Sequence, residues 1–436
     1  MSWSRSAIGA RRASRLRAWA ATTPGRLRLA MAAVLLAAVV AGLVLAGVTA
    51  VQRDATDSIA TRDELLMVDA DGLYASLSDA DATAATMFLR GGTEPADLRA
   101  RYLADLRRAS VQLAGLGRRV QGSSEAAAVA ATGAELPVYS GLIETARANN
   151  RQGFPVGAAY LRQASDLMRA RILPAAGRLY AAEAERLGDD QRTGTSTGGL
   201  VAVLLACVAA LIVIVGAQVF LARRTHRVFN VPLVVATVVL AGLATWVTIA
   251  VTSAQDSLAR AQHDGSDAVQ VLSAARILWL RAQADESLAL VARGGGDRYV
   301  KDFGTVDRLL EPPGGLLGEA SRLAARTGST APVDDLTAAW RGVRAEHARV
   351  ARLESAGSFG DAVHVAVGAN SREAALGDRL SRRFGELITA AQRRFDDAAG
   401  DARSALDGVA VGIPLLLVLC ALPALLGIQT RLNEYR

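Results

Sequence analysis

The sequence has few residues that could crosslink the chain or bind a metal. It contains only two cysteines, Cys207 and Cys420, and both lie in apolar stretches, so no disulfide framework stabilises its polar segments. Its four histidines show no metal-ligand spacing, and it has no nucleophile elbow, phosphate loop or dinucleotide-binding fingerprint. We therefore expect neither an enzyme nor a bound metal or cofactor.

Charge is absent from four long stretches, residues 29–52, 193–222, 228–255 and 408–430. Each is long enough to cross the roughly 30 Å hydrocarbon core of a bilayer as a helix. Because none contains an ionisable side chain, the sequence does not indicate a proton or ion pathway. We predict a membrane protein whose four transmembrane helices cover 29–52, 193–222, 231–253 and 408–430.

Acidic residues are scarce in the short segments that flank these spans, where Glu434 is the one acid. Residues 1–28 form a basic arm with seven arginines, the 223–230 turn has three, and the 431–436 tail adds one net positive charge. The long segments 53–192 and 254–407 each carry a small excess of acids. Arginine-rich short flanks mark the cytoplasmic side. We expect a bacterial plasma membrane protein with cytoplasmic termini, two extracytoplasmic segments and no nucleic-acid role.

The first span has an alternative interpretation as a cleaved signal peptide. Arg11-Arg12 precedes it, and Val48-Thr49-Ala50 places small residues at plausible cleavage positions. However, the apolar run is longer than an ordinary signal core, and no Phe-Leu follows the arginine pair. We expect a retained transmembrane helix, with cleavage as the open alternative.

The chain contains an internal repeat. AGLVLAGVTAV at 41–51 is matched by AGLATWVTIAV at 241–251, and the two stretches lead into DSIA and DSLA respectively. Self-similarity of this kind indicates a duplicated structural unit. We predict two copies of one plan, each made of a span, a long exported segment and a returning span.

Within the exported segments, apolar residues recur at helical spacing, so we expect almost no β-structure. The first segment has a coiled-coil seam and a returning stripe, with Pro174 as a kink, and the second has its own returning stripe. The seam is Leu66, Ala70, Leu73, Leu77, Ala80, Ala84 and Met87, and the stripes are Leu161, Ala164, Met168, Ile172, Ala175 and Leu179, then Leu376, Leu380, Phe384, Leu387, Ala391 and Phe395.

Glycine and proline divide each exported segment into four helical pieces. The predicted breaks are Gly91-Gly92 with Pro95, Gly115–Gly122, Asn149–Pro155, Gly294–Gly296, Pro312–Gly315 and Gly357–Gly360. Pieces of this length, joined by short breaks, favour antiparallel packing. The predicted fold is an all-α membrane protein with two extracytoplasmic antiparallel four-helix bundles.

Two related stretches place acids beside a seam and end on arginine followed by glycine: DADATAATMFLRGG at 79–92 and QADESLALVARGGG at 283–296. Left-handed glycines can close a helix, and an arginine in the last turn suits the helix dipole. Arg281 could pair with Asp285 four residues later. The acids are either a solvated bundle face or part of a surface for an outside partner. The candidate residues for that surface are Asp81, Arg90, Asp285 and Arg293.

Four stretches on this frame resemble the actinobacterial GlnX membrane proteins: SLSDADATAATMFLRGG, NRQGFPVGAAYLRQASDLMR, RAQADESLALVARGGG and GIQTRLNEYR. The resemblance implies an amino-acid sensing relay. In that relay the solute-binding lipoprotein GlnH acts outside the membrane, and the soluble Ser/Thr protein kinase G responds inside. The resemblance assigns no ligand residues.

The predicted cytoplasmic parts are far smaller than the roughly 50 residues of a small domain, so another protein must provide any intracellular output. The candidate contacts for such an effector are Arg223, Arg224, Arg227, Arg431, Glu434, Tyr435 and Arg436. We predict a sensor-adaptor that passes amino-acid status to the kinase. The alternatives are a structural or assembly protein of the cell envelope and, third, a transporter subunit. Self-association to a homo-oligomer is compatible with either role.

Overall fold

The computed structural model describes residues 23–58, 64–90, 95–120, 123–194, 197–225, 231–293, 295–311, 313–368 and 371–433. These residues form α-helices, two short π-helical segments and no strand, which confirms the all-α prediction. The chain divides into two compact units. The apolar unit comprises 1–57, 191–258 and 399–436, and the charged unit comprises 58–190 and 259–398.

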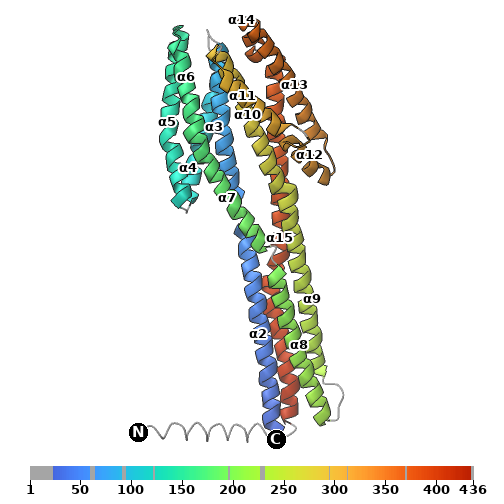
Figure 1. Ribbon diagram of the computed structural model, residues 1–436. Coiled ribbons are helices and arrows are strands. Elements are labelled where there is room, and N and C mark those ends of the chain that lie inside the picture. The colour runs from blue at the N-terminus through green and yellow to red at the C-terminus, as the bar shows by residue number, and fades with distance from the viewer. Residues whose placement is uncertain are drawn as a thin grey trace, which may run out of the picture. The chain divides into compact units, whose positions relative to one another are not determined.

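The apolar unit contains α2 (Thr23–Ser58), α8 (Thr197–Thr225), most of α9 (Val231–Arg260) and the C-terminal part of α15 (Arg372–Asn433). Figure 1 shows these helices running beside one another. Arg53 of α2 forms an ion pair with Asp407 of α15. The amide of Gln218 on α8 donates to the hydroxyl of Thr237 on α9 at 2.7 Å. Gln218 therefore joins two helices, as interhelical polar residues do in membranes.

The outward faces of these helices carry large apolar side chains. Leu36, Leu43, Leu205, Ile212 and Val238 are each about two-thirds exposed in the isolated chain. A water-soluble protein rarely exposes apolar side chains in such density, whereas a lipid-facing helix requires them. The faces that point inward are apolar and mix alanines with larger aliphatic side chains, as in the cluster of Ala41, Ala210, Ile214 and Leu233.

Four helical stretches are long and apolar enough to cross a membrane: Arg28–Thr56, Glu125–Arg151, Gly198–Phe220 and Val231–Ala292. Three of them contain or overlap the predicted spans at 29–52, 193–222 and 231–253. The predicted span 408–430 lies in α15, and most of its side chains fall outside the described residues. These helices support a membrane protein.

The stretch Glu125–Arg151 was not predicted to span, and its packing places it in the charged unit. It belongs to α5 (Ser123–Arg151), where Tyr139 and Ile143 are buried in the core of that unit. Glu125 is also buried and pairs with Arg186 at 2.6 Å. Its alanine-rich composition, rather than a lipid-facing surface, explains why this stretch is apolar enough to count among the membrane-length helices.

The first long segment, predicted to be exported, folds as the four helical pieces that were expected: α3 (Glu64–Arg90), α4 (Ala96–Arg119), α5, and a last piece formed by α6 (Val156–Leu167), η2 (Met168–Ile172) and α7 (Leu173–Gly194). Every residue of the predicted seam and of the first returning stripe is buried. The predicted breaks before Ser123 and Val156 are also present, whereas Gly91-Gly92 lies outside the described residues.

Pro174 does not end the last piece. A proline lacks the N–H that would bond the carbonyl four residues earlier, here that of Ala170. Ala170 lies in η2, where the chain adopts the wider π-helical turn. Such turns are often found at functional sites, and this one carries Arg169.

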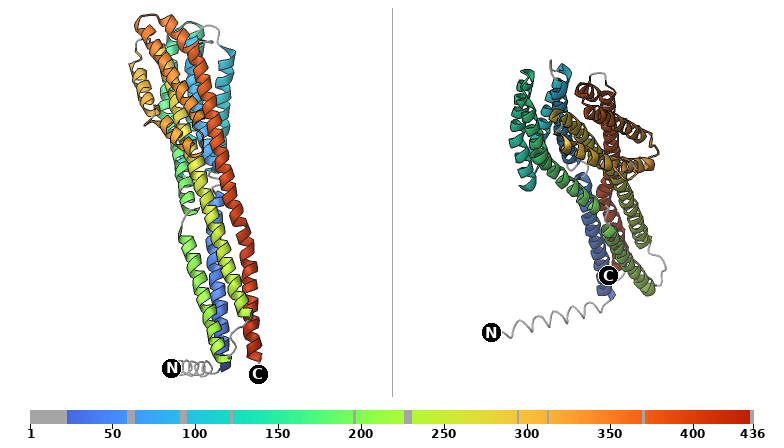
Figure 2. Two further views of the ribbon diagram at one scale, coloured as in Figure 1. Left: turned by 90° about the vertical axis from the view of Figure 1, so that its right-hand side faces the viewer. Right: turned by 45° about the horizontal axis from the view of Figure 1, so that its top comes forward.

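The second segment has more helices than predicted: η3 (Ala261–Ser266), α10 (Asp267–Ala292), α11 (Asp297–Leu310), α12 (Leu316–Arg326), α13 (Ala331–Ser355), α14 (Phe359–Val367) and the N-terminal part of α15. The prediction of four pieces was wrong because the breaks at 327–330 and 368–371 were missed. Gly328 has φ +93°, a left-handed conformation that stops α12. The N-terminal part of α15 runs beside α13 (Figures 1 and 2), with Asp335 paired to Arg379.

The predicted stripe on α15 is only partly buried. Leu380, Phe384, Ala391 and Phe395 are in the core, but Leu376 and Leu387 are half-exposed. Ile388 is buried instead.

The two long segments share one core, so the prediction of two bundles was wrong. Leu288, Ala289, Val291 and Tyr299 of the second segment belong to the same buried cluster as the seam of α3. Leu77 and Ala80, for example, are fully buried in it. A seam of small alanines lets helices approach closely, and here α10 takes the place next to α3.

Candidate functional site

The acids of α3 and α10 lie inside the charged unit. Asp79 is 4% exposed, Asp81 is 3% exposed and Asp285 is fully buried. Because α3 packs against α10 as well as against helices of its own segment, residues beside the seam of either helix point into the shared core instead of solvent. The prediction that Asp81 and Asp285 form an outside partner surface is therefore corrected by their burial.

Asp81 is held by two hydroxyl groups of the first segment. Ser165 donates to its Oδ1 at 2.8 Å, and Tyr139 donates to the same oxygen at 3.3 Å. Burial raises the pKa of Asp81, and its effect outweighs the lowering by Arg169 and by these hydroxyl groups. The ionised form of Asp81 is therefore unfavourable in this buried site, and an additional positive charge beside it would stabilise the carboxylate.

Arg169 of η2 links the two segments, and the sequence did not reveal this role. Its Nη1 forms an ion pair with Asp285 of α10, and lies 3.9 Å from Asp302 of α11. Its guanidinium carbon also lies 5.6 Å from the ring centre of Tyr299. The residue directly follows Met168 in the predicted stripe, which placed it at the edge of a buried face, but its partners are more than a hundred residues away.

The predicted pairing of Arg281 with Asp285 is present but weak. Nε of Arg281 lies 3.9 Å from Asp285, whereas its Nη2 lies 3.3 Å from Asp302. Burial raises the pKa of Asp285 to about 6, although the charge of Arg169 and its hydrogen bond lower it. This cluster consists of three acids and two arginines, namely Asp81, Asp285, Asp302, Arg169 and Arg281. It carries a net negative charge when all five groups are ionised.

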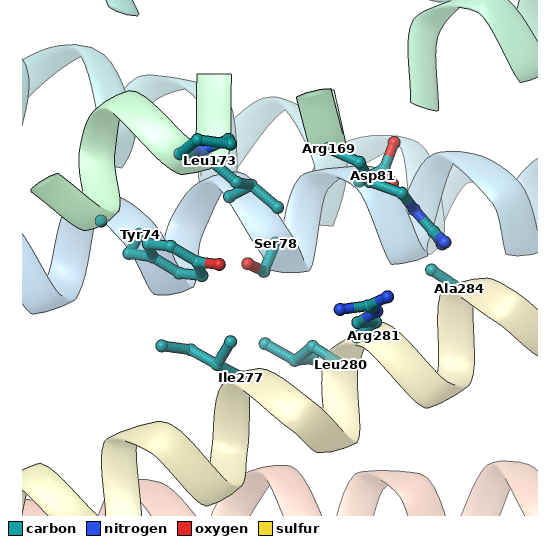
Figure 3. Close-up of a pocket in the computed structure, with 11 residues that line it drawn as sticks. Tyr74, Ser78, Asp81, Arg169, Leu173, Ile277, Leu280, Arg281 and Ala284 are labelled. Atoms are coloured by element: carbon teal, nitrogen blue, oxygen red, sulfur yellow. The ribbon is translucent and has the colours of Figure 1, made fainter. Parts of the chain in front are cut away.

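A cavity of about 340 Å³ lies beside this cluster, between α3, η2, α7 and α10 (Figure 3). Its polar residues are Tyr74, Ser78, Asp81, Arg169 and Arg281, and its other lining residues include Leu173, Pro174, Ile277 and Leu280. Figure 3 shows the hydroxyl groups of Tyr74 and Ser78 turned toward each other beside Ile277 and Leu280. A small apolar cavity with a few convergent polar groups is the usual form of a ligand site.

Several polar atoms around the cavity have no hydrogen-bond partner among the described residues. They are Oγ of Ser78, Nη2 of Arg169 and Oδ2 of Asp285, and all three are buried. More than nine-tenths of buried polar groups in native proteins are paired. Ser78 and Arg169 are also lining residues of the cavity, so two of these unpaired atoms belong to side chains that a ligand there could contact.

A second intersegment ion pair lies farther along the same helices. Arg276 of α10 reaches Asp79 of α3 at 2.7 Å, and Arg101 of α4 lies 3.5 Å from the same carboxylate. Asp105 of α4 is fully buried near them. Burial and the charge of Asp79 raise the pKa of Asp105 to about 7.

The two predicted arginines occupy the other end of α3 and α10. Nε of Arg90 donates to the backbone oxygen of Val367 at 2.6 Å. Arg293 is exposed, and its guanidinium carbon lies 4.8 Å from the ring centre of Phe359. Arg293 itself, with φ 42°, takes the left-handed conformation that was expected of the following glycines. It lines a separate cavity of about 640 Å³, so the four predicted residues do not form one surface.

A further acidic cluster lies between α10, α13 and α15. Burial raises the pKa of Glu373 to about 12, so Glu373 is protonated and hydrogen-bonds Glu286. His347 lies 2.8 Å from Glu286 and stacks on Phe303. These groups bond to one another in the core, which indicates a structural role, although Oε2 of Glu373 is buried without a hydrogen-bond partner among the described residues. Within the described residues, no group of three or more His, Cys, Asp or Glu could hold a metal ion.

The candidate cytoplasmic contacts fall at the limits of the described chain. Arg223 is exposed near the end of α8, while the side chains of Arg224 and Arg431 are outside the described set. Arg227, Glu434, Tyr435 and Arg436 lie wholly outside it.

Comparison with known proteins adds one match. Residues 55–192 match the family model of an actinobacterial sensor domain. No curated protein and no solved structure matches the chain. The match covers the first long segment, including Asp81 and Arg169, and supports a sensor-type protein of actinobacterial kind.

Proposed function

We propose that the chain is a membrane sensor-adaptor for amino acids. In this proposal the exported segments respond to extracytoplasmic amino-acid status through a solute-binding lipoprotein, and the cytoplasmic ends act on a soluble Ser/Thr kinase. The chain catalyses no reaction of its own. The observation that carries the proposal is the sensor-domain match to residues 55–192 in a chain with apolar, membrane-length helices.

The charged network of the charged unit supports this role. The ion pairs of Arg169 with Asp285 and of Arg276 with Asp79 connect the two exported segments, and both carboxylates are buried. A ligand or partner that displaces one helix must therefore disturb ion pairs to the other. A sensor needs two arrangements with different affinities for its ligand, and buried ion pairs that break or form together provide them.

The arginine distribution supports a topology with both exported segments outside. In a chain with Cys207 and Cys420 replaced by alanine, cysteines at Ser123 and Ser329 should react with an impermeant thiol reagent on whole cells. A cysteine at Thr225, beside the arginine-rich turn, should react only after the cells are opened. Labelling is read by mass shift on gels. Reaction of the Thr225 cysteine in cells shown to be intact would contradict the proposed topology, because it would place the arginine-rich turn outside.

The relay itself is tested by retrieval of partners. We expect the tagged full-length chain, solubilised from its native membranes, to retrieve a solute-binding lipoprotein in an amount that changes with added amino acids. It should also retrieve a Ser/Thr kinase. A variant that lacks residues 433–436 keeps Arg431 and should retain the lipoprotein but lose the kinase, because the tail is the most compact cytoplasmic surface.

Quantitative mass spectrometry of both samples measures these amounts. If neither partner is retrieved above an untagged control, the relay is wrong and a structural role in the envelope is favoured. If the truncated chain still retrieves the kinase, the contact lies in the turn or the N-terminal arm.

A further inference from the structure

We propose that the cavity between α3, η2, α7 and α10 binds a small zwitterion that carries an ammonium group and a carboxylate on a short aliphatic frame. This inference rests on the proposed sensing function and names the class of solute that the chain would contact directly. It differs from the relay through a lipoprotein because it requires a ligand site in this chain.

The cavity presents both signs of charge within a small space. Asp81 of α3 lies on one side, and Arg169 and Arg281 come from η2 and α10 (Figure 3). A carboxylate pairs well with an ammonium group, and a guanidinium pairs well with a carboxylate. An α-amino acid carries both partners at the short separation that such a cavity allows.

The unpaired polar atoms favour a ligand that brings its own acceptor. Ser78 is 6% exposed, and its hydroxyl has no hydrogen-bond partner among the described residues. Nη2 of Arg169 is buried and unpaired in the same way. Both are donors, and buried donors without acceptors are unfavourable. Ser78 and Arg169 both line the cavity, so small side-chain rotations would bring these donors to a bound carboxylate.

The charge of the cluster disfavours a simple anion. Of the charged groups only Asp81, Arg169 and Arg281 line the cavity. Asp285 and Asp302 already pair with the two arginines from outside it, so a carboxylate without an ammonium group would meet Asp81 with no surplus positive charge to offset it. A simple amine would satisfy Asp81 but would leave the guanidinium donors unpaired. Only a molecule with both groups improves both sides of the cavity.

The size and walls of the cavity limit the remainder of the ligand. A volume of about 340 Å³ is near the lower end of small-molecule sites, which favours a ligand smaller than a peptide or nucleotide. Leu173, Ile277 and Leu280 provide apolar walls. A short aliphatic side chain fits these walls without a further polar partner.

Calorimetric titration of the purified full-length protein in detergent tests the proposal. The probes are valine, its decarboxylated analogue isobutylamine and its deaminated analogue isovalerate, followed by glycine, alanine and leucine. We expect valine or another of these amino acids to bind. The amine and acid matched to that amino acid should bind about tenfold more weakly or not at all, because each loses one charged contact.

Three variants locate the site. Asp81→Asn and Ser78→Ala should each weaken binding of the same amino acid, the first by about tenfold. Arg322→Gln removes an exposed arginine that pairs with Glu319 outside the cavity, and should bind as the unmodified chain does. Because burial raises the pKa of Asp81, its replacement by neutral Asn should not lower the thermal midpoint, so a binding loss would not report unfolding.

The proposal is overturned if none of these amino acids binds, if an amine or acid analogue binds as tightly as its amino acid, or if Asp81→Asn binds normally. Retrieval of lipoprotein and kinase distinguishes this failure from failure of the sensor-adaptor function. Absent amino-acid binding with intact retrieval removes only the direct site, whereas binding without retrieval removes only the relay.

Discussion

Replacement of Arg169 by methionine should destabilise the charged unit more than any other single charge removal. The substitution keeps much of the side-chain volume but leaves Asp285 fully buried without its main counter-ion. Removing one partner of a buried ion pair costs about 3–5 kcal/mol, and we expect about 3 kcal/mol because Arg169 is 20% exposed. The thermal midpoint of the full-length protein in detergent should fall by roughly 10 °C.

A double variant tests whether the lost charge, and not the lost side-chain volume, lowers the thermal midpoint. Addition of Asp285→Asn to Arg169→Met removes the stranded carboxylate and should restore most of the midpoint. Arg322→Gln, which breaks an exposed pair with Glu319, should leave it almost unchanged, since exposed ion pairs contribute little. A double variant no more stable than Arg169→Met alone would show that packing, not the ion pair, is lost.

Asp105→Asn should stabilise the charged unit at neutral and alkaline pH. The pKa of Asp105 is raised by burial from 3.8 to about 7, so the folded state favours the protonated acid. Its contribution to stability is fully present below the unfolded pKa of 3.8 and is lost as the pH rises through about 7. Between pH 5.5 and 8.5 the loss amounts to about 2 kcal/mol from this group.

Thermal midpoints measured across this pH range provide the test. The unmodified chain should be more stable at pH 5.5 than at pH 8.5, and Asp285, with its pKa raised to about 6, acts in the same direction. Asp105→Asn should raise the midpoint at pH 8.5 and reduce the pH dependence. Asp378→Asn, at an exposed acid near Arg101, serves as the control. An Asp105→Asn midpoint that falls at pH 8.5 would mean that Asp105 is needed as an anion.

The apolar pattern of the sequence was sufficient to predict the helices that form the core of the first segment. From Leu66 to Met87 the spacing of three and four residues places every seam residue on one buried face. The returning stripe from Leu161 to Leu179 was equally predictable. Such patterns are local, and they specify which face is buried without specifying which helix covers it.

The candidate site depended on information that local patterns do not contain. Asp81 and Asp285 were identified as unusual acids, but they were placed on the surface because the shared core of the two segments was not foreseen. Arg169 was missed because its partner Asp285 is 116 residues away and its orientation depends on a π-helical turn. The missed break at Gly328 has a similar cause, since one left-handed glycine ends a helix without a proline nearby.

The shared core has a consequence for how the protein is made. Asp79 and Arg276 are 197 residues apart, so α3 leaves the ribosome long before α10 exists. At about 5–20 residues per second, this interval is roughly 10–40 s. During that time the alanine-rich face of α3 has no partner from the second segment and is open to aggregation or to a chaperone. Residues 55–192, which match the sensor-domain model, therefore do not contain all of the core that they help to form. That core is complete only after α10 and the start of α11 have been synthesised.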